Sequence, residues 1–170
     1  MFDRMFLALW PDDAGRKALA RHIESWTWPE AGDRYRPADW HVTLHFLGKV
    51  AAGRLAQLAT GLRVPFDAFD LVLDQPERWP RGLAVLGASA LPEQLADLHE
   101  RLARTIALLG LPVEQRRYRP HVTLARHAAA ALPPSHWAPV VWPVRGYTLV
   151  LSTGRPEERY RVIESYGGQG

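Results

Sequence analysis

The tetrapeptide His-Val-Thr-Leu occurs twice in the chain, at residues 41–44 and again at residues 121–124. The first copy is set in Trp-His-Val-Thr-Leu-His-Phe-Leu-Gly (residues 40–48) and the second in Pro-His-Val-Thr-Leu-Ala-Arg (residues 120–126). Both stretches are rich in β-branched and apolar residues, which favours strands. Because side chains alternate between the faces of a strand, each copy presents its histidine and threonine on one face and its valine and leucine on the other. We therefore expect two strands that each rest an apolar face on a core and expose an imidazole and a hydroxyl.

The spacing of the two copies indicates an internal duplication. The two histidines lie 80 residues apart in a chain of 170 residues, and a predicted helix and an arginine-rich loop precede each copy. This size suits one domain or two small lobes that share a core. We predict an α+β fold in which residues 1–170 form a single bilobal domain, with two pseudo-symmetric antiparallel sheets flanked by helices. The polar faces of the two motif strands are then expected to meet across a central cleft.

Hydrophobic periodicity and turn residues predict the remaining elements. Strands are expected at residues 4–10, 66–75, 83–88, 140–152 and 158–166, in addition to the two motif strands. Helices are expected at residues 12–26, 54–62 and 92–109, the last with leucines and an isoleucine at helical spacing and Gly110 at its end. Residues 28–38, 76–82, 113–119 and 127–139 are expected to be loops and turns.

Composition excludes several classes of chemistry. The chain contains no cysteine, so it has neither disulfides nor thiolate nucleophiles nor cysteine-bound metal. Residues 1–10 are apolar but short and carry two charges, which fits neither a signal peptide nor a membrane span, and we expect a cytoplasmic protein. The net charge is +3, and arginine supplies nearly all of the positive charge. Arginine favours bidentate contacts with phosphate, although a charge of +3 alone does not indicate nucleic acid.

Two histidines that face one cleft can act as a general acid and a general base. Imidazole titrates near neutrality, so one ring can be protonated while the other is neutral, and the rate is expected to be bell-shaped in pH around neutrality. The threonine hydroxyl on the same face can donate a hydrogen bond to an oxygen between the two rings. Phosphodiester chemistry suits this arrangement when arginines stabilise the anion, and we expect a positive cleft. The candidate arginines are Arg34, Arg36, Arg116, Arg117, Arg119 and Arg126.

Other readings of the histidines are less well supported. A zinc site is the obvious competitor, but His41 and His45 would be about 13 Å apart on a strand, too far to share an ion. No Gly-x-Ser-x-Gly elbow indicates a serine nucleophile. Duplication of a stable strand without any chemistry is a further alternative, but it does not explain why the repeated face is polar. The four other histidines, at positions 22, 99, 127 and 136, are expected to be surface or capping residues.

The motif pair resembles a known family. Two His-x-Thr-apolar strands about 80 residues apart, together with residues 36–48, 118–126 and 149–166 and the opening FLALW, are similar to the 2H phosphoesterase superfamily. The closer match is its branch of RNA 2′,3′-cyclic phosphodiesterases, once called 2′-5′ RNA ligases. The resemblance covers essentially the whole chain. It implies a bilobal fold and a metal-independent reaction, without cofactor, that opens an RNA 2′,3′-cyclic phosphate to a 2′-phosphomonoester.

The resemblance also implies roles for individual residues. His41 resembles the proton donor to the leaving 3′ oxygen, and His121 the acceptor that activates water. Thr43 and Thr123 would hold phosphate oxygens, and Arg126 matches a position of the second motif that binds substrate. Strict alternation puts Arg126 on the face opposite His121, so its role requires a strand end or a bulge. Alternation places His45 on the face of His41, where it could touch substrate.

The resemblance indicates a class of substrate, whereas the residues by themselves do not distinguish among several phosphate esters. We expect RNA ends or nucleotides that carry a 2′,3′-cyclic phosphate, with no membrane partner, and a monomeric enzyme. Small cyclic nucleotides, a cyclic ADP-ribose phosphate or 2′,5′-linked oligonucleotides stay open as substrates, as does a module that binds phosphorylated RNA ends without turnover. Two proton carriers argue against a binding module. Ligation through a 2′,5′ bond is the chemical reverse of opening the cycle and is expected as a weak side activity.

Overall fold

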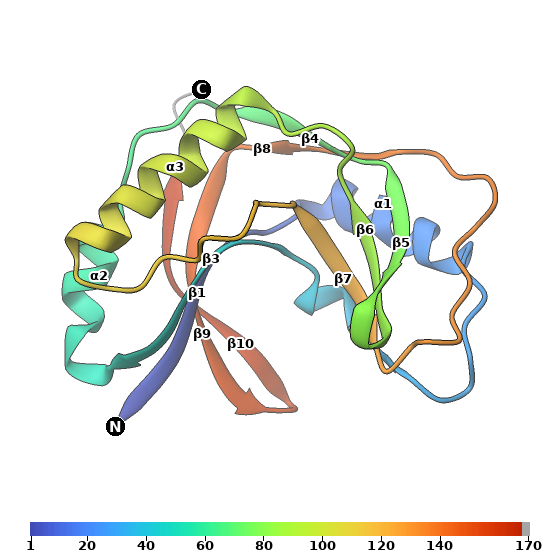
Figure 1. Ribbon diagram of the computed structural model, residues 1–170, viewed down its shortest axis with the longest axis horizontal. Helices are drawn as coiled ribbons and strands as arrows, with labels where there is room; N and C mark the ends of the chain where they lie inside the picture. Colours follow the sequence, from blue (N-terminus) through green and yellow to red (C-terminus); the bar gives the residue numbers. More distant parts are fainter. Residues whose placement is uncertain (168–170) are drawn as a thin grey trace.

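The computed structural model describes residues 1–167, which form ten strands, three α-helices and three short 3-10 helices (Figure 1). The α-helices are α1 (Asp13–Glu24), α2 (Leu55–Gly61) and α3 (Glu93–Leu108). The 3-10 helices are η1 (Pro37–Asp39), η2 (Ala52–Arg54) and η3 (Pro80–Gly82). The strands are β1 (Phe2–Leu9), β2 (Asp33–Arg34), β3 (Val42–Ala51), β4 (Phe69–Leu73), β5 (Gln75–Trp79), β6 (Leu83–Gly87), β7 (His121–Arg126), β8 (Val140–Val144), β9 (Gly146–Arg155) and β10 (Glu158–Gly167).

The main sheet has two halves that meet at the motif strands. Its order is β10-β9-β1-β3-β7-β6-β5, with β2 paired to β7, and all of its strand pairs are antiparallel. The strands β3 and β7 are joined by a single pair, Val42 opposite Val122. The predicted α+β fold with antiparallel sheets and flanking helices is therefore confirmed, and the two motifs lie at the seam between four-stranded halves.

Helices and a second, two-stranded sheet cover the core. The helix α3 packs against β3, and α1 packs against β8, which pairs with β4. Four apolar residues of α3 are fully buried at the spacing that the sequence predicts, namely Leu95, Leu98, Leu102 and Ile106. The apolar face of β3 therefore packs against the core, and the motif histidine lies on the opposite face of the strand.

Several predicted strand limits were wrong, and the expected loop at residues 28–38 contains the short strand β2. The expected turn at residues 76–82 contains the strand β5, which begins at Gln75. This strand lies at the edge of the sheet, where the missing N–H group of Pro76 costs no ladder hydrogen bond. The expected single strand at residues 140–152 is divided into β8, which pairs with β4, and β9, which pairs with β1 and β10.

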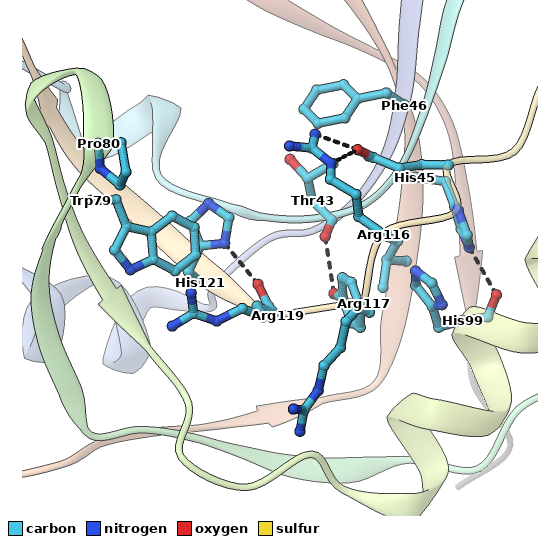
Figure 2. Close-up of a pocket in the computed structure, with 13 residues that line it drawn as sticks. Thr43, His45, Phe46, Trp79, Pro80, His99, Arg116, Arg117, Arg119 and His121 are labelled. Carbon is cyan, nitrogen blue, oxygen red and sulfur yellow. Dashed lines mark hydrogen bonds and ion pairs between the residues drawn. The ribbon is translucent and has the colours of Figure 1, made fainter.

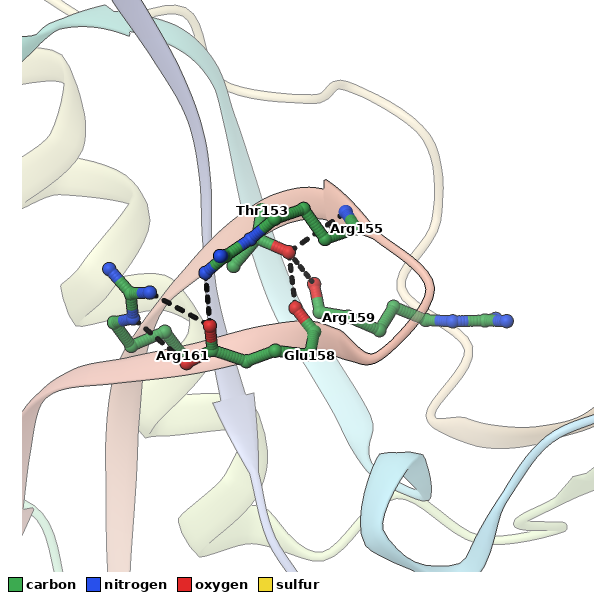
Figure 3. Close-up of polar contacts among 5 residues, drawn as sticks. All are labelled: Thr153, Arg155, Glu158, Arg159 and Arg161. Carbon is green, nitrogen blue, oxygen red and sulfur yellow. Dashed lines mark hydrogen bonds and ion pairs between the residues drawn. The ribbon is translucent and has the colours of Figure 1, made fainter.

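The hairpin between β9 and β10 projects from the sheet and is fixed by polar contacts (Figure 3). Its turn contains Gly154, whose φ of 73° falls in the left-handed region that favours glycine. The Thr153 hydroxyl donates to the Glu158 carbonyl oxygen and accepts from the Arg155 N–H at 3.0 Å. The Glu158 carboxylate accepts from the guanidinium groups of Arg155 and Arg161, the latter at 2.8 and 3.0 Å. These contacts hold β10 in register where it approaches the motif strands.

Candidate active site

The one residue pair that joins the two motif strands, Val42 opposite Val122, sets the geometry of the site. Counting outward from Val42 and Val122 in antiparallel register places His41 across from Thr123 and Thr43 across from His121. These four side chains lie on one face because both valines are buried on the other. Diagonal neighbours in such a ladder are roughly 7–8 Å apart, so the two imidazoles can bracket one phosphate group.

Both motifs line one cavity of about 540 Å³. Its walls come from β1, β3, β7, β9 and β10. The lining residues are Arg4, Met5, Phe6, Tyr35, His41, Thr43, Phe46, Gly48, Lys49, His121, Thr123, Arg126, Ser152 and Tyr160. The structure thus brings together all five residues that the sequence singled out for catalysis and phosphate binding, and their roles in the reaction stay predictions.

The two histidines are held in the same tautomer by equivalent hydrogen bonds. His41 Nδ1 lies 2.8 Å from the Asp39 carbonyl oxygen, and His121 Nδ1 lies 2.8 Å from the Arg119 carbonyl oxygen. A carbonyl oxygen only accepts, so each Nδ1 carries the hydrogen and each Nε2 is the nitrogen that can exchange a proton. His41 Nε2 lies 3.2 Å from the Thr43 hydroxyl, which points toward the same space.

Aromatic rings surround His41 on three sides. Trp10 stacks on the imidazole with ring centres 4.9 Å apart, and Phe6 and Tyr160 approach it at 5.1 and 5.2 Å. Burial lowers the pKa of His41 to about 4, against a smaller opposing effect of the Asp39 carbonyl. The charge of His121 lowers the pKa of His41 further. In the ligand-free protein His41 is therefore neutral at pH 7.

His121 has a more open setting and a positive neighbour. Its ring lies 4.3 Å from the Trp79 indole. Burial lowers the pKa of His121, the hydrogen bond to the Arg119 carbonyl raises it, and the Arg119 charge lowers it. A phosphate group bound between the rings would raise both histidine pKa values, because an opposite charge stabilises imidazolium.

A β-bulge brings Arg126 into the cavity. On the neighbouring strand β6, Val85 pairs with Thr123 while the adjacent Ala84 pairs with Ala125, so Leu124 is an extra residue in the ladder. The alternation of faces shifts by one position there, and Arg126 returns to the face of His121. The bulge that the role of Arg126 requires is present, and its guanidinium lies 5.5 Å from the centre of the Tyr35 ring.

The same kind of bulge shows that the placement of His45 was wrong. On β1, Leu7 pairs with His45 and Ala8 with Thr43, so the residue between them is extra. Alternation predicted His45 on the face of His41, but its side chain is buried on the other side, and Phe46 takes the place in the cavity. His45 Nε2 lies 2.8 Å from the His99 carbonyl oxygen, and the two rings stack at 3.9 Å.

The other predicted arginines are divided between the site and its surroundings. Arg116, Arg117 and Arg119 line a second pocket that adjoins the cavity. Arg34 instead lies over the Trp28 ring, and Arg36 pairs with the buried Asp39 at 3.2 Å. Arg126 lines the cavity, and Arg4 and Lys49 add positive charge that the motif pattern did not reveal.

Sequence reasoning missed the aromatic wall of the cavity. Tyr35 and Tyr160 line the cavity, and Trp10 stacks on His41. These three residues come from segments far apart in the chain, and none of them belongs to a repeated motif. The expectation for His22 was also wrong, because its ring is buried and accepts a 3.0 Å hydrogen bond from the Trp26 indole. Within residues 1–167 no three histidine, cysteine, aspartate or glutamate side chains are grouped as metal ligands would be. No helix of that part is long and apolar enough to span a membrane.

Comparison with known proteins matches both the sequence and the fold. A model of the 2′-5′ RNA ligase superfamily matches residues 15–154, which include both motifs. The chain is 35% identical over 147 residues to the RNA 2′,3′-cyclic phosphodiesterase of Escherichia coli, with 81% of each chain covered. It is 35% identical over 101 residues to the Bacillus subtilis protein of that name, with 53% of this chain and 52% of the relative covered.

Solved structures give the same result over the full length. The crystal structure of E. coli LigT complexed with 3′-AMP superposes with a TM-score of 0.83 at 26% identity and covers all of both chains. A crystal structure described as a phosphoesterase superposes with a TM-score of 0.85 at 25% identity. With the family model matching most of the chain and the fold shared throughout, this chain belongs to the 2′-5′ RNA ligase superfamily.

Proposed function

We propose that this protein is an RNA 2′,3′-cyclic phosphodiesterase that opens the cyclic phosphate at an RNA end to a 2′-phosphomonoester. The names of the E. coli and B. subtilis relatives support the activity. The main structural support for the proposal is that the imidazoles of His41 and His121 line one cavity. In both rings Nδ1 is hydrogen-bonded to a backbone carbonyl oxygen, which leaves Nε2 free to exchange a proton.

In the proposed reaction each histidine handles one proton. A water molecule attacks the phosphorus and passes a proton to Nε2 of His121 while the bond from phosphorus to the 3′ oxygen breaks. His41, protonated at Nε2, gives its proton to that leaving oxygen, so the numbers of protons taken and given are equal. The division of roles between the two histidines rests on the resemblance to the 2H phosphoesterases.

The remaining side chains of the cavity would bind the charge of the phosphate. The Thr43 and Thr123 hydroxyls can donate to its non-bridging oxygens, and Arg126 can pair with them. Donors held in place before the substrate arrives stabilise the charge of the transition state at low reorganisation cost. The aromatic rings at His41 are suited to hold the nucleoside next to the leaving oxygen.

Three properties of the whole protein belong to this proposal. Residues 1–170 act as one bilobal domain, the enzyme works as a monomer, and it acts in the cytoplasm on RNA ends. Likeness to LigT over the full length of both chains supports the single domain. The oligomeric state can be checked by sedimentation at the protein concentration of the assay.

Hydrolysis of adenosine 2′,3′-cyclic phosphate in excess EDTA tests the proposal. We expect turnover with 2′-AMP as the product, and a lower KM for a short RNA with the same cyclic end. Formation of 3′-AMP would contradict the assignment of the leaving oxygen. No turnover, or turnover that EDTA abolishes and a divalent metal restores, would contradict the metal-independent mechanism.

A further inference from the structure

The cavity that holds the two motif histidines extends well beyond them along β1. Ala8 of β1 pairs with Thr43, whereas Arg4, which also lines the cavity, pairs with Lys49. Four residues of extended strand cover roughly 13 Å, so the cavity is longer than a single phosphate group. One end holds the reacting phosphate, and the reaction proposed above leaves the far end without a ligand.

The far end of the cavity carries two positive charges side by side. Arg4 and Lys49 are directly opposite each other in the antiparallel ladder of β1 and β3, and both are exposed. Residues in such positions have Cβ atoms roughly 5 Å apart, and like charges there destabilise a sheet. Within residues 1–167 neither side chain has a carboxylate within ion-pair distance. An anion bound between the two cations would remove their repulsion.

A hydroxyl group continues this row of polar side chains across the sheet. On its other side Arg4 pairs with Ser152 of β9, which also lines the cavity. Lys49, Arg4 and Ser152 therefore lie in one row on the adjacent strands β3, β1 and β9 (Figure 1). Two cations and a hydroxyl donor are groups that bind phosphate oxygens. The far end of the cavity is thus suited to a second phosphate group.

Exposed phenylalanine rings lie on both sides of the row. Side chains alternate along β1, so Phe2, Arg4 and Phe6 share one face of the strand. Phe46 pairs with Phe6 on one side of the row and is 61% exposed, and Phe2 lies on the other side and is 69% exposed. Exposed aromatic rings beside cations on a sheet are the combination with which proteins stack the bases of single-stranded RNA.

A second pocket adjoins the catalytic end of the cavity beside His121 (Figure 2). Its volume is about 350 Å³, and it is lined by Trp79 and by the stacked rings of His99 and Tyr118. In a phosphoryl displacement the entering and leaving oxygens lie roughly in line on opposite sides of the phosphorus. Because His121 serves the entering water in the proposed reaction, this pocket lies on the side of the water, opposite the ribose.

The ribose of the substrate lies on the side of His41, which serves the leaving 3′ oxygen. The His41 ring is 5.1 Å from the ring of Phe6, and Arg4 follows on the same face of β1. In an RNA chain the 5′ oxygen of this ribose carries the phosphodiester to the preceding nucleotide. That phosphodiester can reach Arg4 and Lys49 while the cyclic phosphate lies between the two histidines.

We infer that Arg4, Lys49 and Ser152 bind the phosphodiester on the 5′ side of the terminal nucleotide of an RNA. The base of the preceding nucleotide stacks on Phe2. This inference rests on the function proposed above and narrows its substrate to a single-stranded RNA end, in preference to a mononucleotide. The cavity thus binds two successive phosphate groups of one strand, the reacting one at the histidines and the next at the far end.

Three substrates with the same cyclic end separate the phosphodiester from the base. They are adenosine 2′,3′-cyclic phosphate, the same nucleotide with a methyl phosphate on its 5′ oxygen, and the adenosine dinucleotide with a 2′,3′-cyclic end. We expect kcat/KM to rise at least about tenfold from the first to the second through charge-assisted contacts, and about fivefold further in the dinucleotide through stacking. Added salt should reduce the first gain more than the second.

Substitution of the two cations tests the phosphodiester site. The readout is the ratio of kcat/KM for the methyl phosphate substrate to that for adenosine 2′,3′-cyclic phosphate, since a change at the histidines affects both alike. Arg4→Gln and Lys49→Gln should each lower this ratio at least about threefold, and the double variant should bring it close to one. Arg104→Gln is the matched control, because it changes the net charge equally and Arg104 pairs with Glu100 on α3.

Substitution of Phe2 tests the base site. Phe2→Leu should lower kcat/KM for the dinucleotide relative to the methyl phosphate substrate at least about threefold, whereas Phe2→Trp should keep the full gain. The ratio of the methyl phosphate substrate to the mononucleotide should stay the same in both variants. Equal losses for all three substrates in Phe2→Leu would contradict stacking on this ring.

The outcomes separate the inference from the proposed function. Turnover of all three substrates with equal kcat/KM would overturn the inference alone. An unchanged ratio in Arg4→Gln and Lys49→Gln, or an equal fall in Arg104→Gln, would do the same. Absence of turnover with all three substrates would overturn the proposed function, and the inference with it.

Discussion

Phe46 and Arg126 occupy equivalent positions in the two motif strands, each five residues after its histidine and each in the same cavity. In both strands the leucine of the motif is the extra residue of a β-bulge. The β-bulge is therefore part of the duplicated strand. It turns Phe46 in the first copy and Arg126 in the second onto the face of the histidines. The two motif strands have the same backbone irregularity, but the first places an aromatic side chain in the cavity and the second a basic one.

Arg126 is expected to bind substrate because the bulge directs it at the phosphate site. Arg126→Ala should lower kcat/KM for the cyclic substrate about 10- to 100-fold, the effect of losing a charge-assisted contact. Arg155→Ala is the control, because Arg155 belongs to the β9–β10 hairpin and pairs with Glu158. Equal losses in the two variants would point to overall charge instead of a direct contact.

Replacement of either motif histidine should remove one proton transfer. His41→Ala and His121→Ala are each expected to lower kcat roughly 100-fold or more, and the double variant should lose less than the sum of the free energies. A substrate with a good leaving group needs little protonation, so it should rescue His41→Ala far more than His121→Ala. Equal rescue would show that the donor and acceptor are assigned wrongly.

The pH dependence should differ between kcat/KM and kcat. In the free protein burial lowers the pKa of His41 to about 4 and that of His121 below its ordinary value. The protonated donor is therefore depleted at neutral pH, and kcat/KM, which reports the free enzyme, should peak on the acid side of 6.5. Bound phosphate raises both pKa values, so kcat should peak at higher pH, nearer to neutrality. Identical profiles centred above pH 7 would contradict this account.

The buried His22 should make the fold sensitive to acid. Burial lowers its pKa to about 4, and its Nε2 accepts a hydrogen bond from Trp26, which requires the neutral ring. Between pH 6.5 and 4 the unfolded chain binds a proton that the folded protein does not, so the free energy of unfolding falls as pH falls. The loss from His22 should approach about 3 kcal/mol at the acid end of this range.

His22→Gln keeps a hydrogen-bond acceptor and removes this titration. Urea unfolding at pH 7 and pH 4 should show a smaller loss of stability in the variant than in the natural protein. His41 and His99, whose pKa values are also lowered to about 4, contribute equally to both proteins and cancel in the difference. A loss of the same size in both proteins would contradict the assignment to His22.

Tyr118 should matter to both the stability and the site because its hydroxyl joins the loop before β7 to Thr43. Tyr118→Phe keeps the ring stacked on His99 and is expected to cost about 1–2 kcal/mol in the free energy of unfolding. It should also lower kcat, since Thr43 loses a backbone anchor. Tyr166→Phe is the matched control, because that hydroxyl donates to the Ala59 carbonyl at 2.7 Å, away from the cavity. A fall in kcat of the same size in the control would argue against a local effect.

The sequence alone was sufficient for the features that depend on local pattern. Alternation in the two HVTL strands determined that histidine and threonine share a polar face, and the 80-residue repeat indicated two related halves. The helices were predictable for the same reason, since the apolar stripe of α3 follows the period of the helix. These properties require only which neighbours along the chain are apolar.

Only the tertiary structure decided how the two halves meet and what surrounds the histidines. A bulge is set by pairing with a second strand, so strict alternation placed His45 on the face that Phe46 occupies and Arg126 on the face opposite His121. The pKa of His41 follows from Trp10, Phe6 and Tyr160, which lie up to 154 positions apart in the chain and meet only when β1, β9 and β10 pair. The pocket beside His121 has the same origin, because burial and stacking depend on strands and loops that are distant in the sequence and adjacent in the fold.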